Sequence, residues 1–76
     1  MNVIKLLAEL EANFGLDDFY AISLWPTLKE ITLQGNFTDN NIKFATAMNI
    51  ELKYEDGYVR GTSEDGHVKI TLATTN

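Results

Sequence analysis

The chain has 76 residues, of which 45% are hydrophobic and 22% are charged, with eleven Asp and Glu against six Lys and Arg. This length predicts one small domain over residues 1–76 and excludes a second. The net charge of -5 excludes a protein that neutralises nucleic-acid phosphates over its whole surface. The absence of cysteine excludes disulfides, thiolate metal sites and thiol nucleophiles, and it favours a reducing cytoplasm as the location.

The first half of the chain predicts a helix followed by two strands. Apolar side chains recur at helical spacing over residues 3–14, and Gly15 is typical of the residue that ends a helix. Residues 20–25 are rich in aromatic and β-branched side chains, and Pro26 ends that strand by removing a backbone donor. Residues 30–34 alternate polar and apolar side chains, which predicts a second strand in a hairpin with the first.

A second helix is predicted over residues 39–48. Thr38 is a suitable N-cap, and Phe37 precedes it at the position from which a hydrophobic staple reaches Ile42. Asn49 tolerates the left-handed conformation that ends many helices.

Three strands follow as a meander. Asp56-Gly57 is a strong signal for a two-residue turn, and Asp65-Gly66 predicts another. Both turns place the same side chains on one inner face, an agreement that a one-residue slip would destroy. Gly61 lies in the middle of this face and predicts that a helix approaches closely there. The inner face comprises Leu52, Tyr54, Val59, Val68, Ile70 and Leu72.

The fold class is therefore α+β, in the order α-β-β-α-β-β-β, with an antiparallel sheet of about five strands and two helices on one face. The sequence leaves open where the first hairpin joins the sheet. The last strand, residues 68–73, is predicted as an exposed edge that is available to a second copy, so we expect a monomer or a weak dimer.

The sequence predicts no membrane partner and no secretory signal. No stretch approaches the roughly 18 apolar residues of a membrane span. The apolar run near the N-terminus is interrupted by Glu9 and Glu11, where a signal peptide would continue.

The chain offers little material for catalysis. His67 is the only histidine, and it follows a turn, where water is hard to exclude. The acidic pairs Asp17-Asp18 and Glu55-Asp56 lack the alternating oxygen ligands and distal Glu of a calcium loop and are typical of turns. We expect no enzyme activity, no catalytic residue, no metal and no cofactor.

A basic stripe on the outer face of the meander is the strongest candidate for a binding site. The predicted register places Lys53 directly opposite Arg60, with Lys69 nearby. Like charges that face each other destabilise a sheet, and a local conflict of this kind points to function. The alternative is an ordinary solvated face on which the diagonal Glu51 and Glu55 neutralise the stripe.

Two aromatic residues complete the candidate surface. Tyr58 lies among the basic residues. Trp25 has the opposite parity from Tyr20 and Ile22, so it points outward as an interface anchor if those side chains face the core. A half-buried position in the core is the alternative.

These features favour a non-enzymatic protein-binding domain that acts by occlusion or complex formation. Small acidic domains are common among phage and mobile-element proteins that inhibit host defence or nucleic-acid-handling proteins, anti-CRISPR proteins among them, and the likeness is one of size and charge alone. Mimicry of a phosphate backbone ranks below occlusion, because the carboxylates are scattered along the chain. The alternatives are a nucleic-acid-binding module that uses Lys53, Arg60 and Lys69, which the net charge opposes, and a small-molecule-binding or regulatory subunit.

Overall fold

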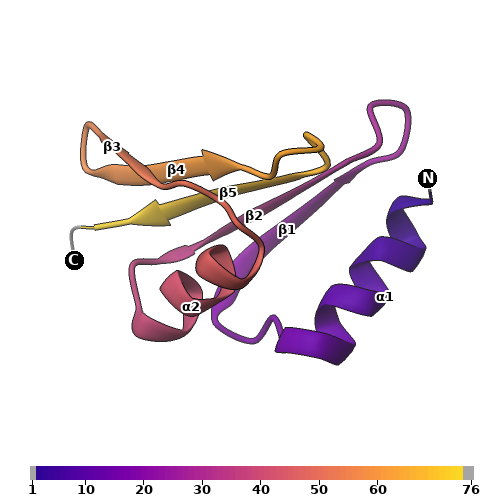
Figure 1. Ribbon diagram of the computed structural model, residues 1–76, viewed down its shortest axis with the longest axis horizontal. Helices are drawn as coiled ribbons and strands as arrows, with labels where there is room; N and C mark the ends of the chain where they lie inside the picture. Colours follow the sequence, from indigo (N-terminus) through magenta and orange to yellow (C-terminus); the bar gives the residue numbers. More distant parts are fainter. Residues whose placement is uncertain (1, 75–76) are drawn as a thin grey trace.

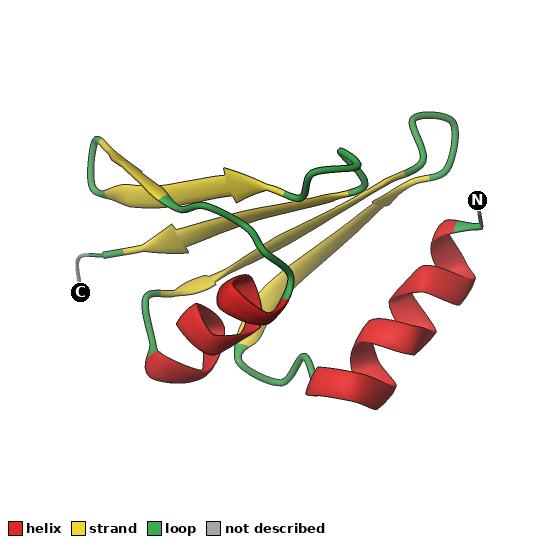
Figure 2. Ribbon diagram, viewed as in Figure 1, coloured by secondary structure: helices red, strands yellow, loops and turns green. Residues whose placement is uncertain are grey.

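A computed structural model describes residues 2–74 as one sheet with two helices (Figure 1). The element order is the predicted one, and both helices pack on the same face of the sheet (Figure 2). The elements are α1 (Val3–Phe14), β1 (Phe19–Trp25), β2 (Glu30–Asn36), α2 (Asp39–Ala47), β3 (Lys53–Glu55), β4 (Tyr58–Thr62) and β5 (Val68–Ala73).

The sheet has the strand order β1-β2-β5-β4-β3. Three of its pairings are antiparallel, but β2 and β5 are parallel, with Ile31 opposite Val68 and Gly35 opposite Leu72. The prediction of an antiparallel sheet is thereby corrected to a mixed and mostly antiparallel one. The prediction that the last strand is an edge is wrong, because β5 lies in the centre and the edges are β1 and β3. The most deeply buried side chains of the sheet, Ile31, Leu33, Val68, Ile70 and Leu72, lie on the two inner strands β2 and β5, because a strand with neighbours on both sides is best shielded from water.

The predicted register of the C-terminal meander is confirmed. Lys53 lies opposite Arg60, and Val59 lies opposite Leu72. One member of the predicted inner face is wrong, however, since Tyr54 is 71% exposed. Tyr54 shares a face with Val59, but it lies on the short edge strand β3, which the helices leave uncovered (Figure 1).

The helix ends follow the predicted capping. The Thr38 side chain accepts a hydrogen bond from the backbone N–H of Asn41 at 3.3 Å, and Gly15 and Asn49 have φ angles of 70° and 56°. Asn2 caps α1 by accepting a bond from the N–H of Ile4 at 2.9 Å. Side-chain oxygens thus satisfy backbone donors that have no partner within a helix.

A buried asparagine joins α2 to the sheet. Asn41 is 1% exposed, and its Nδ2 donates to the backbone oxygens of Asp18 at 3.1 Å and Asn36 at 2.8 Å. Gly35 provides the space, because a Cβ there would lie 2.8 Å from this Nδ2. The two bonds fix the start of α2 against the end of the first hairpin, since a buried amide is costly to leave unpaired.

Most apolar side chains of β1 are only partly buried. Ile22 and Leu24 lie opposite Leu33 and Ile31, which are fully buried, yet Ile22 and Leu24 are 41% and 36% exposed. Tyr20 lies at a shift in register and is 65% exposed. Ile22 and Leu24 therefore point to the helix side, which is the condition under which Trp25 was expected to point outward, but they stay partly exposed because β1 has a neighbouring strand on one side only.

Gly61 meets the connection after α2 rather than a helix. A Cβ at Gly61 would lie 2.5 Å from both the backbone oxygen of Glu51 and the Cγ2 of Ile50. The predicted close approach is correct in place, but the approaching segment is the extended chain between α2 and β3. The absence of a side chain at Gly61 therefore determines how this segment crosses the sheet.

We expect Gly61→Ala to lower the free energy of unfolding by about 1–3 kcal/mol, because the added methyl group overpacks a closed contact. Urea unfolding followed by circular dichroism measures this loss. Thr62→Ala, at the next position of the same strand and exposed, is the control and should lose less. A Gly61→Ala protein as stable as the wild type would contradict the close approach.

Candidate functional site

The face of the sheet opposite the helices, here called the outer face, is polar. Alternation along β2 and β5 buries Ile31, Leu33, Ile70 and the other core side chains on the helix side, so their sequence neighbours point outward. The outer face carries Trp25, Glu30, Thr32, Gln34, Lys53, Glu55, Tyr58, Arg60, Thr62, Lys69 and Thr71.

The predicted basic residues lie together on this face. Lys53 is directly opposite Arg60 on the neighbouring strand, where Cβ atoms are about 4.5–5.5 Å apart. On the other side of β4, Arg60 lies opposite Thr71 of β5. Lys69, two residues before Thr71 on β5, lies opposite Thr62. Strand pairing therefore forms the basic stripe from three adjacent strands, β3, β4 and β5.

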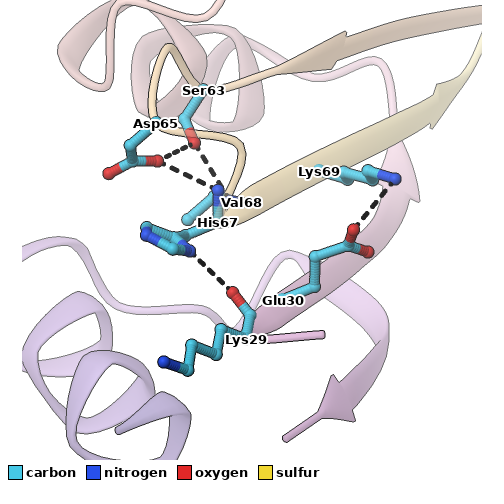
Figure 3. Close-up of polar contacts among 7 residues, drawn as sticks. All are labelled: Lys29, Glu30, Ser63, Asp65, His67, Val68 and Lys69. Carbon is cyan, nitrogen blue, oxygen red and sulfur yellow. Dashed lines mark hydrogen bonds and ion pairs between the residues drawn. The ribbon is translucent and has the colours of Figure 1, made fainter. Parts of the chain in front are cut away.

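Carboxylates approach two of the three cations. Arg60 Nη1 lies 3.9 Å from Glu55 Oε1, and the Arg60 guanidinium lies 5.5 Å from the centre of the Tyr58 ring. Lys69 Nζ lies 3.2 Å from Glu30 Oε1 (Figure 3). These pairs are partly exposed and contribute at most about 1 kcal/mol each.

The predicted neutralisation of the stripe is thus present in part. Glu55 acts as expected, whereas Glu51 forms no ion pair within residues 2–74. Lys53 forms none within the same residues. Glu30 was missed by the sequence analysis, because it reaches Lys69 only through the parallel pairing of β2 with β5.

The stripe borders a shallow hollow of about 580 Å³ on the outer face. Its charged lining is mixed, with three basic residues and two glutamates. The lining residues are Thr32, Glu51, Lys53, Glu55, Arg60, Gly61, Thr62, Lys69, Ile70 and Thr71. A surface with both signs of charge favours selectivity over non-specific attraction to polyanions.

Trp25 lies on the same face at the opposite corner. It is 50% exposed and pairs with Glu30, the residue that holds Lys69. Four strand spacings separate β1 from β3, which places Trp25 about 19 Å from the line of Lys53. The structure therefore places all five candidate residues on one face but brings only four of them close together.

His67 lies in a turn that its neighbours stabilise (Figure 3). Asp65 Oδ1 accepts hydrogen bonds from Ser63 Oγ at 2.7 Å and from the backbone N–H of His67 at 3.0 Å. The His67 ring instead directs Nδ1 to the backbone oxygen of Lys29 at 2.7 Å. Serine, aspartate and histidine are close here, but Asp65 orients the backbone and the hydroxyl rather than the imidazole, so the arrangement is not a catalytic triad.

Members of both predicted acidic pairs have structural roles. Asp18 Oδ2 accepts a bond from Asn40 Nδ2 at 2.8 Å beside a second hollow of about 480 Å³ between α1 and α2. Asp56 has a φ of 50° in its turn. Within residues 2–74 no group of three or more His, Asp or Glu side chains is placed to hold a metal ion. No helix in this part of the chain is long and apolar enough to cross a membrane.

Comparison of the chain with protein-family models, with curated proteins and with solved structures finds no significant match.

The Ser63–Val68 turn makes a testable contribution to acid stability. The backbone N–H of His67, and then the Ser63 hydroxyl, hold the pKa of Asp65 below its ordinary value of 3.8. A carboxyl whose pKa is lowered by folding stabilises the protein fully above its unfolded value, and this contribution is lost as the pH falls through the lower folded value.

We expect Asp65→Asn to be less stable than the wild type at pH 7, with the difference shrinking below about pH 4. Thermal unfolding across pH 2–7 measures the difference. Glu64→Gln is the control, because the Glu64 side chain accepts no hydrogen bond within the described part of the chain. An Asp65→Asn difference that stays constant down to pH 2 would refute the role of the charge.

Proposed function

We propose that the chain is a non-enzymatic protein-binding domain that acts by occlusion or complex formation through its basic stripe, Lys53, Tyr58, Arg60 and Lys69. The observation that carries the proposal is the direct opposition of Lys53 and Arg60 on a sheet face that neither helix covers (Figure 2). Facing like charges cost free energy of folding. A partner that places a carboxylate against this pair removes the repulsion and gains the interaction.

The neighbouring side chains support a protein partner. Arg60 lies over Tyr58, and arginine and tyrosine are among the residues that dominate the energy of protein interfaces. The hollow beside them is lined by both signs of charge, which suits a partner surface of mixed charge. The antiparallel strands that carry these residues fix their backbone, so binding has to order side chains but no loop.

The finer form of the proposal is an inhibitor of phage or mobile-element origin that covers a site on a host defence or nucleic-acid-handling protein, in the manner of anti-CRISPR proteins. Its support is the small size of the chain, its net charge of -5 and its uncovered sheet face. An acidic body repels nucleic acid from the site that it covers.

A nucleic-acid-binding module is the second candidate, because three of the six basic residues lie together with Tyr58. Two observations favour the protein partner. Carboxylates already approach Arg60 and Lys69, and the stripe offers one aromatic ring where single-strand binders use several.

The test is capture of partners on the immobilised chain from nuclease-treated lysate of the source cell. We expect the wild type to retain a protein, and Lys53→Glu combined with Arg60→Glu to weaken its retention at least tenfold, or about 1.4 kcal/mol. Lys5→Glu combined with Lys43→Glu is the matched control, because it changes the net charge equally at exposed positions of the two helices.

If the wild type and the Lys53→Glu, Arg60→Glu variant retain the partner equally, the basic stripe is not the binding surface. Binding of single-stranded DNA or RNA at low salt without any retained protein would favour the second candidate instead.

A further inference from the structure

The two edges of the sheet differ in their protection. β3 has three residues, KYE, two of them charged, and short charged edge strands resist pairing with other chains. β1 has seven residues, FYAISLW, with no charge. Its outward backbone groups face no further strand within residues 2–74. β1 is therefore an unprotected edge, whose unpaired backbone groups form a template for pairing with another chain.

Exposed apolar side chains accompany this open backbone. Tyr20 is 65% exposed and Trp25 is 50% exposed, while Ile22 and Leu24 are 41% and 36% exposed. Both faces of the strand contribute, because Ile22 and Leu24 point to the helix side and Trp25 points to the outer face. A partner strand would cover these side chains as well as the backbone.

We propose that β1 pairs antiparallel with β1 of a second copy, so that two five-stranded sheets join into one continuous sheet. This dimer goes beyond the proposed function and does not depend on it. The predicted dimer edge thereby moves from β5, which is central, to β1.

The sequence of β1 is complementary to itself in this arrangement. Pairing centred on Ile22 places Tyr20 opposite Leu24 of the second copy and Ala21 opposite its Ser23. Because β1 contains no charged residue, the paired strands bring no like charges together, although each copy carries a net charge of -5. The two-fold symmetric contact is the ordinary form of a homodimer interface.

Charges beyond the strand select the antiparallel direction. Asp17 and Asp18 precede β1, and Lys29 follows it. Antiparallel pairing brings the acidic start of one strand beside the turn that carries Lys29 in the other copy. Parallel pairing would bring the two acidic starts together, at a cost in like-charge repulsion.

The available area fits a weak dimer. Taking about 200 Å² for an exposed aromatic side chain, Tyr20 and Trp25 together offer roughly 230 Å² at their exposed fractions. Ile22, Leu24 and the backbone edge raise the total to several hundred Å² per copy, below the roughly 800 Å² of a standard interface. Association in the micromolar range or weaker follows.

The dimer leaves the basic stripe free. β3 and β4 lie at the far edge from β1, and a two-fold axis perpendicular to the sheet places both outer faces on the same side. The dimer therefore presents two stripes in one direction, which strengthens binding to a partner with two matching sites.

Sedimentation velocity of the full chain from about 1 μM to about 1 mM tests the proposal. We expect the mass to rise from 8.5 kDa to twice that value with concentration. Ile22→Lys and Ser23→Lys should each raise the dimer dissociation constant at least tenfold, because the new charges lie directly opposite each other at position 22 and diagonally across the two strands at position 23. Tyr54→Lys is the control on the protected edge and should leave the dimer unchanged.

A mass of one chain throughout the range would overturn the proposal, and so would loss of the dimer in Tyr54→Lys to the same extent as in the β1 variants. Circular dichroism checks that each variant is folded. If Ile22→Lys unfolds, Ser23→Lys decides the matter, because Ser23 is exposed and its replacement removes no core packing. A dimer that survives Ser23→Lys intact would also exclude the β1 edge.

Discussion

The parallel pairing of β2 with β5 is the contact on which the rest of the structure depends. It joins the first hairpin to the C-terminal meander in one sheet, and α2 with its flanking segments carries the chain from one to the other. The paired side chains Ile31, Leu33, Val68 and Ile70 are at most 1% exposed. Since a lone two-stranded hairpin is marginally stable in water, the first hairpin depends on its pairing with β5 for stability.

The same pairing determines the outer face. Because β5 is central, Lys69 lies between Thr32 of β2 and Thr62 of β4 and forms an ion pair with Glu30, and the basic stripe crosses three strands. Because β1 and β3 become the edges, one edge is charged and the other apolar. Two surfaces of different chemistry thus arise from one strand order: a stripe suited to a charged partner and an edge suited to another strand.

Much of the fold could be predicted because its signals are local. The cap at Thr38, the positive φ of Gly15 and Asn49, and the turn at Asp56-Gly57 each specify a backbone conformation within a few residues. The two turns of the meander fix the register of β3, β4 and β5. This register places the residues of the basic stripe next to one another.

The position of the first hairpin could not be predicted in this way. A segment of the length between β2 and β3 is compatible with either a neighbouring or a crossing connection, so the pairing of Glu30 with Lys69 stayed hidden. The role of Asn41 was hidden for a similar reason, since its acceptors are backbone oxygens of Asp18 and Asn36 that only the tertiary fold brings to it. The exposure of Tyr54 and of the β1 side chains was also hidden, because it results from the edge positions of β3 and β1. The alternation of polar and apolar residues does not reveal which strands are edges.

The central claim is that β2 and β5 form one cooperative unit that holds the outer face as a rigid platform. Native-state hydrogen exchange of the backbone amides, measured by NMR at increasing urea concentration, tests it most directly. The account predicts that the slowest amides of β2 and β5 exchange with the same free energy, equal to that of global unfolding. A clearly lower exchange free energy for β2 than for β5, with its own urea dependence, would show that the two halves open separately and would contradict the account.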